Sequence, residues 1–333
     1  MEYEVRETQS KISPGYLGGT VLARLLAHPN ASDFEITTIV RDVEKAKKLD
    51  SFGVKTVVGS FKSDHVLLQQ HVEKAHIVFN CGDSDDYAFI EALLAGIRKR
   101  HTKSNDIPIL IHTSGTAILT AGHETKGMAI TDIIYDDSDF EQMERLPAEA
   151  LHRNVDLAIM KADAEGCLKA YLVTPSTIFG VPTSPFVNAG IQNSHSLQFP
   201  WLIRASLGRG QAGMVGKGLA IWNAVHVDDV ADLFIVLYDG ISKNPDAVGH
   251  GRKGYYFAEN GEYTWYDVSK AIGRAMVELV LSKSDEPTTF TSEELVKYWG
   301  SERMNGALVA SPEPATPGPV AASRSGRYPE DAL

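Results

Sequence analysis

The stretch with the clearest chemical role is GYLGG, residues 15–19, which precedes apolar residues at helical spacing. The N-terminus of a helix carries unpaired backbone N–H groups and a partial positive charge, so it binds phosphate. Glycine allows the backbone to approach a phosphate closely. The stretch therefore predicts the phosphate site of a dinucleotide, although an ordinary surface turn uses the same residues. The predicted binding residues are Gly15, Tyr16, Leu17 and Gly18.

Arg41 and Asp42 follow a β-branched run, residues 34–40, that is typical of a short strand. In dinucleotide-binding folds the ribose lies at this strand end. An acidic residue there suits the 2′-hydroxyl of NAD, and an arginine suits the 2′-phosphate of NADP. Arg41 therefore favours NADP, while Asp42 keeps NAD open. The other interpretation of Arg41 is a solvated cation at a strand end.

Ser114 lies in the stretch HTSGT, residues 112–116, directly after another apolar run. Ligands of open α/β sheets bind beyond the carboxyl ends of the strands. A hydroxyl at that place can donate a hydrogen bond to a substrate carbonyl as negative charge develops on its oxygen. Ser114 is therefore a predicted catalytic residue. The alternative is a serine that only satisfies backbone groups of the Thr-Ser-Gly turn.

Apolar patterns that alternate between helix and strand must position these residues. Helices separated by β-branched runs imply right-handed βαβ units and a parallel sheet, so the predicted class is α/β. Strands are predicted over residues 34–40, 54–61, 76–82, 107–115 and 168–180. Helices are predicted over residues 18–28, 43–53, 64–75, 85–100, 147–166, 230–241, 268–281 and 291–300.

Composition restricts the class of partner. The 333 residues are 43% hydrophobic, enough for one large domain or two modest ones. A net charge of −11 and a pI of about 5.5 argue against nucleic acid and anionic membranes as partners. Cys81 and Cys167 lack metal-binding spacing, which favours buried thiols and no metal site. With no secretory signal and no membrane-spanning run, a cytoplasmic protein with a small-molecule substrate is expected.

Four motifs in order resemble the short-chain dehydrogenase/reductase superfamily in its extended and atypical branches. They are GYLGG at 15–19, HTSGT at 112–116, TPSTIFG at 174–180 and VHVDDVADLF at 225–234. The nearest resemblance is to fungal NAD(P)-binding proteins similar to nucleoside-sugar epimerases and NmrA-like proteins. It implies a Rossmann-like doubly wound parallel sheet with a smaller C-terminal substrate lobe. The implied boundaries are 1–180 for the NAD(P)-binding domain, 181–303 for the lobe and 304–333 for a disordered tail.

The resemblance assigns roles to the residues that match its motifs. Gly15 and Gly18 fall on the second and third glycines of the turn, and Ser114 falls on the serine beside the nicotinamide. The loop that covers the nicotinamide is matched by Pro175, Ser176 and Thr177. A C-terminal helix starts near His226 and Asp228, with Asp228 expected as its N-cap and His226 as a packing or hydrogen-bonding residue.

Both ends depart from the family pattern. The first strand of such a sheet is buried on both faces and should be continuously apolar, but residues 1–12 are not. That strand is therefore expected to be missing or replaced, which leaves a gap in the sheet. The C-terminal end becomes rich in Pro and Ala. Altered splicing, a frameshift or a gene-model error would account for both departures.

The family's Tyr-x-x-x-Lys pair, which supplies its general acid, is also absent. On the corresponding predicted helix, His152 and Asp156 have the same spacing, and histidine can donate a proton near neutral pH. His152 and Tyr135 are therefore the candidate acids. The alternative is that His152 and Asp156 are solvated on a helix surface.

Together these features predict an NAD(P)-dependent oxidoreductase or epimerase-like enzyme that acts on a small carbonyl or alcohol compound and prefers NADP. Two alternatives stay open. The missing Tyr/Lys pair favours a non-catalytic NAD(P)-binding sensor or regulatory protein of NmrA-like type. The atypical first strand favours a truncated product with impaired cofactor binding.

Overall fold

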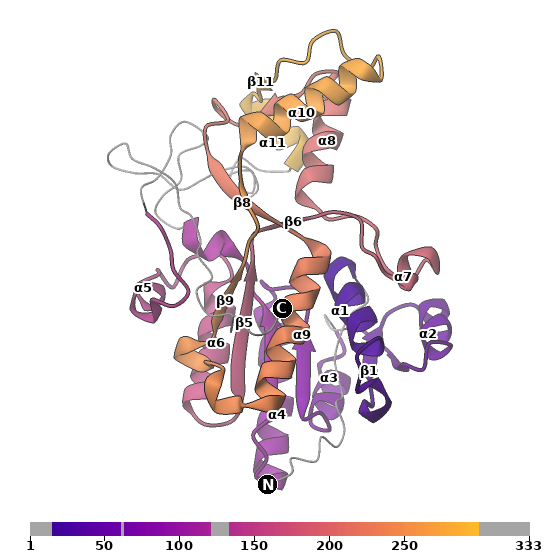
Figure 1. Ribbon diagram of the computed structural model, residues 1–333, viewed down its shortest axis with the longest axis vertical. Helices are drawn as coiled ribbons and strands as arrows, with labels where there is room; N and C mark the ends of the chain where they lie inside the picture. The colour runs from indigo at the N-terminus through magenta and orange to yellow at the C-terminus, as the bar shows by residue number, and fades with distance from the viewer. Residues whose placement is uncertain (1–14, 61–62, 121–132, 300–333) are drawn as a thin grey trace.

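The computed structural model describes residues 15–60, 63–120 and 133–299. Figure 1 shows a larger lobe, which holds the parallel strands, and a smaller lobe of mostly helices at the other end of the long axis.

Strands and helices alternate along the larger lobe, as the sequence pattern predicts. Its strands are β1 (Thr37–Val40), β2 (Lys55–Val58), β3 (Ile77–Asn80), β4 (Ile109–Thr113), β5 (Lys169–Pro175) and β9 (Tyr255–Ala258). Its helices include α1 (Tyr16–Leu26), α2 (Val43–Asp50), α3 (His65–Val72), α4 (Tyr87–Ser104), α5 (Phe140–Glu144), α6 (Arg153–Ala164) and α9 (Val227–Lys243). Neighbouring strands run parallel. The predicted α/β class is therefore confirmed.

Within the described residues of the larger lobe, the parallel strands form two separate groups. β1 pairs with β2, and the other group has the order β3-β4-β5-β9. In the doubly wound strand order, the first strand lies between the strands that correspond here to β1 and β3. Both of these strands are buried along their whole length. Within the described residues these two groups are not joined. Residues 1–12, from which the missing first strand was inferred, lie outside the described residues, so the missing strand stays a prediction.

The two faces of the sheet are covered by different helices. On β3, Ile77 and Phe79 belong to a core that includes α1 and α9. Val78, which points to the opposite face, belongs to a core with α3, α4 and α6. Alternation of side chains along a strand places them in this way, and helices on both faces are what a buried parallel sheet requires.

The smaller lobe has its own core. Its helices are α8 (Gln198–Arg209), α10 (Trp265–Glu278) and α11 (Ser292–Trp299), and its strands include β6 (Thr177–Phe179), β7 (Gly213–Met214), β8 (Ile221–His226), β10 (Glu262–Thr264) and β11 (Thr288–Thr289). Trp265 is buried there against Leu202 and Met276. α10 begins with a capping box between Thr264 and Asp267, at the pattern visible in the sequence.

The chain passes between the lobes more than once. β6 and β8 pair in the smaller sheet, and the chain then returns to the larger lobe as α9 and β9. Helix α7 (Pro185–Asn188) also lies near α1 (Figure 1). The boundary at residue 180 stays a prediction, and the tail predicted over 304–333 lies outside the described residues.

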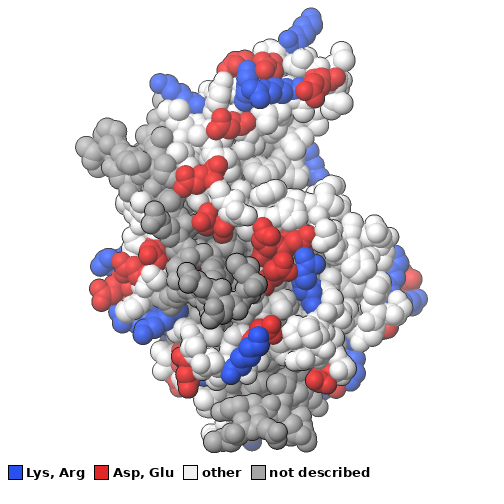
Figure 2. Space-filling view, in the orientation of Figure 1, with Lys and Arg blue, Asp and Glu red and all other residues white. Residues whose placement is uncertain are grey.

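Acidic and basic side chains are interspersed on the face shown in Figure 2. Among the described residues, no helix is long and apolar enough to cross a bilayer, and no group of three metal-ligating side chains occurs. Cys81 and Cys167 are free and partly buried.

Candidate functional site

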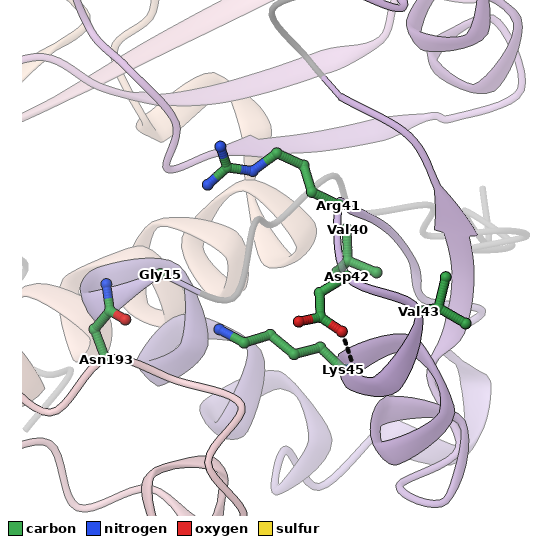
Figure 3. Close-up of a pocket in the computed structure, with 7 residues that line it drawn as sticks. All are labelled: Gly15, Val40, Arg41, Asp42, Val43, Lys45 and Asn193. Carbon is green, nitrogen blue, oxygen red and sulfur yellow. Dashed lines mark hydrogen bonds between the residues drawn. The ribbon is translucent and has the colours of Figure 1, made fainter.

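Two adjoining cavities follow the carboxyl ends of the parallel strands. The first, of about 630 Å³, is lined by Gly15, Val40, Arg41, Asp42, Val43, Lys45 and Asn193 (Figure 3). The second, of about 620 Å³, includes Tyr16, Leu17, Ser114, His152 and Asn193 in its lining. Asn193 lies at both cavities, and α1 begins between them. Together they form a crevice that extends from Arg41 to His152, with volumes typical of small-molecule sites.

The N-terminus of α1 supplies the phosphate-binding end of this crevice. Gly15 is the N-cap, and the first bond within the helix runs from the Gly19 N–H to the Gly15 carbonyl at 3.1 Å. The first turn contains no acidic residue, and no side chain caps it. The N–H groups of the first turn are thus oriented for an anion. Gly15, Tyr16 and Leu17 line the crevice, whereas Gly18 lies buried inside the helix and is not among the lining residues described.

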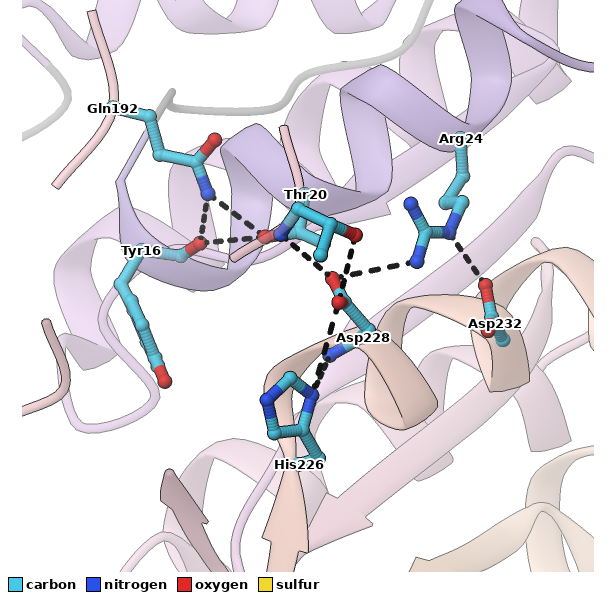
Figure 4. A network of polar contacts seen from close by, with 8 residues as sticks. Tyr16, Thr20, Arg24, Gln192, His226, Asp228 and Asp232 are labelled. Carbon is cyan, nitrogen blue, oxygen red and sulfur yellow. Dashed lines mark hydrogen bonds and ion pairs between the residues drawn. The ribbon is translucent and has the colours of Figure 1, made fainter. Parts of the chain in front are cut away.

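Gln192 holds the glycine turn from the outside. Its Nε2 donates to the Tyr16 carbonyl at 2.6 Å and to Thr20 Oγ1 at 2.8 Å (Figure 4). Gly19 makes room for it, because a Cβ at that position would lie 2.5 Å from Gln192 Cδ. The Tyr16 hydroxyl donates to the carbonyl of Gly180 at 2.7 Å. No local pattern in the sequence points to Gln192, which lies 176 positions after Tyr16.

Ion pairs attach the other side of α1 to α9. Arg24 Nε is 2.6 Å from Asp232 Oδ1, and Arg24 Nη2 is 3.3 Å from Asp228 Oδ1. His28 Nε2 lies 3.0 Å from Asp239 Oδ1. Asp228 also accepts from the Thr183 hydroxyl at 2.8 Å. α1 is therefore held by segments that belong to the second half of the chain (Figure 4).

The N-cap of α9 differs from the expectation. His226, and not Asp228, is the N-cap, and its Nδ1 accepts from the Asp228 N–H at 3.2 Å. The ring nitrogen of His226 thus accepts from the backbone N–H two residues further along, which is the bond that an N-cap side chain makes. This leaves the Asp228 carboxylate available for Arg24 and Thr183.

Two cations line the first cavity. Figure 3 shows the side chains of Arg41 and Lys45 extending from the end of β1 and the first turn of α2 toward the glycine turn. Asp42 between them is the N-cap of α2, where its Oδ1 accepts from the N–H groups of Glu44 and Lys45 at 2.7 and 3.1 Å. These backbone hydrogen bonds lower the pKa of Asp42. Asp42, the residue that left NAD possible as the cofactor, therefore uses one of its two carboxylate oxygens to cap α2.

Ser114 lies in the second cavity with its hydroxyl directed at a buried carboxylate. Its backbone N–H donates to the Val173 carbonyl at 2.8 Å, which extends the β4–β5 pairing by one residue. Its Oγ donates to Asp156 Oδ2 at 2.8 Å. In this arrangement the hydroxyl offers lone pairs to a ligand, and the predicted donation to a carbonyl would require the bond to Asp156 to break.

Asp156 is completely buried and is shared by several groups. Its Oδ2 also accepts from the Tyr255 hydroxyl at 3.1 Å, and that hydroxyl accepts from Arg153 Nη1 at 2.5 Å. Burial raises the pKa of Asp156 to about 6, even though the bonds from Ser114 and Tyr255 favour the ionised form. We refer to Ser114, Asp156, Tyr255 and Arg153 as the buried polar chain.

His152 occupies the cavity because the helix starts later than predicted. α6 begins at Arg153, and His152 has a left-handed backbone with φ of 67°. A non-glycine residue with this backbone is strained, and such residues concentrate at functional sites. His152 therefore points to the crevice while Asp156 points inward. The interpretation of both as solvated side chains on one helix surface is wrong.

A carboxylate orients the His152 ring. Nδ1 lies 2.7 Å from Asp85 Oδ1 and 3.1 Å from Ser84 Oγ, and Nε2 lies against Gly115, where a Cβ would be only 3.0 Å away. Burial raises the pKa of Asp85, but the hydrogen bond to His152 and the charge of His152 together lower it by more. The pKa of Asp85 is therefore below its ordinary value. Asp85 was missed in the sequence because its acidic run also suits the start of a helix.

The remaining predicted residues divide into two groups. Pro175 and Ser176 line the second cavity, with the Ser176 hydroxyl donating to the Ala258 carbonyl at 3.1 Å. Thr177 is buried and its Oγ1 accepts from the Tyr263 hydroxyl at 2.8 Å, so it is not among the lining residues described. Tyr135 is likewise buried, in the core beside α6, and burial raises its pKa. The structure thus brings His152, but not Tyr135, to the cavity.

Comparison with known proteins agrees with this architecture. A family model described as the TrkA-N domain matches residues 15–117. The chain is 26% identical over 318 residues to the oxidase ucsJ of Acremonium sp, covering 89% of this chain and 88% of the relative.

Solved structures show the same fold. The UDP-glucose 4-epimerase of Thermotoga maritima, determined with UDP-glucose, is similar with a TM-score of 0.54 at 13% identity, covering 85% of each chain. A dTDP-glucose 4,6-dehydratase of Streptomyces venezuelae, determined with NAD and TYD, gives a TM-score of 0.57 at 13% identity, covering 89% of this chain and 91% of the other.

Proposed function

We propose that this Rossmann-fold chain is related to the extended short-chain dehydrogenases/reductases and that it is an NADP-preferring oxidoreductase that acts on a small alcohol or carbonyl compound. One observation carries the proposal: a single crevice joins the N-terminus of α1, two cations and the His152–Asp85 pair. The named similarity to an oxidase over most of the chain supports it.

The residues present fit a dinucleotide phosphate. The N-terminus of α1, with no acidic residue in its first turn, would hold the pyrophosphate. Arg41 and Lys45 would hold a 2′-phosphate, while Asp42 is engaged as the N-cap of α2. Pro175 and Ser176 would lie beside the nicotinamide. When bound, the nicotinamide accepts or returns a hydride at the substrate carbon.

His152 is the proposed acid and base. Because Nδ1 lies against the Asp85 carboxylate, Nδ1 carries a hydrogen and Nε2 is the nitrogen that can accept a proton. Nε2 takes the proton of a substrate hydroxyl during oxidation and returns it to a carbonyl oxygen in the reverse direction. Ser114 donates its own proton to Asp156, so in this arrangement it does not donate to the substrate oxygen. The acceptor nitrogen of His152 favours binding of the alcohol form.

Titration of the full-length protein with NADPH and NADH tests the proposal. We expect saturable binding of both, with NADPH tighter, and cofactor oxidation or reduction on a panel of simple alcohols, aldehydes and ketones. Tighter binding of NADH would contradict the cofactor preference. Loss of all binding would support the alternative of impaired cofactor binding.

A second candidate is a sensor that binds the dinucleotide without turnover. The bond from Ser114 to Asp156 favours it, because the serine proton is not available to polarise a carbonyl. Binding of NADPH together with failure to exchange hydride with any member of the panel would support this candidate over the enzyme.

A further inference from the structure

The second cavity differs chemically from the first beyond the reacting end. Its wall in the smaller lobe includes the apolar and aromatic side chains of Ile178, Leu197, Trp201 and Trp222, with the polar residues Asn193, His195, Ser196 and Gln198 beside them. Leu151 lies beside His152 on the same cavity. Rings and branched aliphatic chains of this kind recognise apolar surface, with a few polar groups that fix orientation. The wall therefore favours an apolar ligand.

The charge of the second cavity points the same way. Its described lining contains no lysine or arginine, and its one carboxylate is Asp85. A diphosphate needs cations or several converging N–H groups when it leaves water. The N-terminus of α8 reaches the cavity at Leu197 and Gln198, but Pro200 has no N–H to offer. This cavity thus lacks what Arg41 and Lys45 supply to the first one.

Exposed apolar surface remains at the cavity. The Leu197 residue is 62% exposed and Leu151 is 41% exposed, although both line a concave site. Apolar surface of this kind beside polar groups is typical of a ligand-binding groove. An apolar ligand would remove both side chains from water and gain the hydrophobic contribution of that burial.

We infer that the substrate is an uncharged alcohol, or its ketone, whose carbinol carbon carries a planar apolar group that stacks on Trp201 and Trp222. This inference rests on the proposed function and departs from the nucleotide-sugar ligand found with the epimerase of the same fold. In the reaction, the secondary alcohol loses a hydride to NADP⁺ and a proton to His152, which yields the ketone, NADPH and one proton released to solvent.

Calorimetric titration of the full-length protein, saturated with NADP⁺, tests the substrate class. The ligands are 1-(2-naphthyl)ethanol, its analogue with a ring carboxylate, and UDP-glucose. We expect the neutral alcohol to bind at least ~10-fold more tightly than the carboxylate, because the carboxylate would lose water without gaining a cation. UDP-glucose binding as tight as the neutral alcohol, or no saturable binding of that alcohol, would overturn the inference.

Two exposed leucines provide a matched pair of variants. Leu197→Ala removes apolar surface from the cavity and should weaken binding of the neutral alcohol about 3- to 10-fold. Leu207→Ala, on the same helix but outside the described lining, should leave that affinity unchanged. Equal effects of the two variants would contradict the proposed contact. Hydride transfer is measured separately, so a protein that binds the neutral alcohol but does not oxidise it would contradict the proposed function and not the ligand class.

Discussion

The two strand groups of the larger lobe carry different parts of the site. The β1–β2 pair leads to two cations on the first cavity, the exposed Arg41 and the partly buried Lys45. The β3-β4-β5-β9 group leads to the buried polar chain and His152. Charges in water act weakly and tolerate displacement, whereas buried polar groups act strongly and must be satisfied. Binding affinity is thus distributed over flexible side chains, and reactivity depends on a few fixed ones.

Substitution of His152 gives the largest expected effect and tests whether reactivity is confined to the second group. His152→Asn should lower turnover by about 10²- to 10⁴-fold, because general acid–base catalysis contributes on that order, and should leave NADPH affinity unchanged. Steady-state kinetics and NADPH titration measure the two quantities. His76→Asn is the matched control, because His76 Nδ1 lies 2.8 Å from Asp106 Oδ2 in a similar pair. Neither residue belongs to the described lining of the two cavities. Wild-type turnover in His152→Asn would contradict the assignment of His152 as the acid and base.

The buried polar chain makes stability depend on pH. Burial raises the pKa of Asp156 from 3.8 to about 6, so the native state holds this proton more tightly than the unfolded chain does. The stabilisation is therefore complete below the unfolded value and is lost as the pH rises through about 6. Urea unfolding should show that the wild type loses about 3 kcal/mol more of its free energy of unfolding than Asp156→Asn does across this window. Asp229→Asn, at an exposed position, should keep the wild-type profile. Parallel profiles for wild type and Asp156→Asn would contradict the shift.

α1 lies between the two groups, and Gly19 tests how it is held. Gly19→Ala places a methyl group 2.5 Å from Gln192 Cδ and should reduce the free energy of unfolding by about 1–3 kcal/mol. Urea denaturation measures this loss. In a Gln192→Ala background the same substitution should cost much less, because the obstructing side chain is gone. An unchanged cost in that background would show that Gln192 does not limit the space.

The cations of the first group should give the smallest effect and one sensitive to salt. Arg41→Ala combined with Lys45→Ala should weaken the binding of NADPH about 10-fold and the binding of NADH much less. This difference between the two cofactors should shrink at high ionic strength, because salt screens exposed charges. Titration at low and high salt measures it. Lys47→Ala is the control, because Lys47 pairs with Glu44 on the same helix and is not in the described lining. Equal weakening of NADPH binding and NADH binding would show that these cations do not contact the 2′-phosphate.

Local features of the chain were predictable from the sequence. The β-branched runs that became β1 and β2, and the capping box at Thr264, depend on residues only a few positions apart. The same holds for the glycine turn before α1. Side-chain periodicity and capping residues act at short range, so one sequence suffices to recognise them.

The arrangement of the reacting groups was not predictable in this way. The His152–Asp85 pair joins residues 67 positions apart, and the left-handed backbone at His152 interrupts a pattern that is helical by periodicity. The contact of Gln192 with α1 spans 172 or more positions. Such pairs depend on tertiary packing, which overrides local propensity.

The contacts of α1 have a consequence for synthesis of the chain. Its hydrogen bonds to Gly180, Gln192 and Asp232 join residues separated by 164 to 208 positions. An 11-residue helix is marginal in isolation, and contacts of high sequence separation form slowly. On the ribosome, α1 emerges early but acquires its partners only after α9 has been made. α1 is translated long before its partners and is therefore among the last helices to be fixed in place.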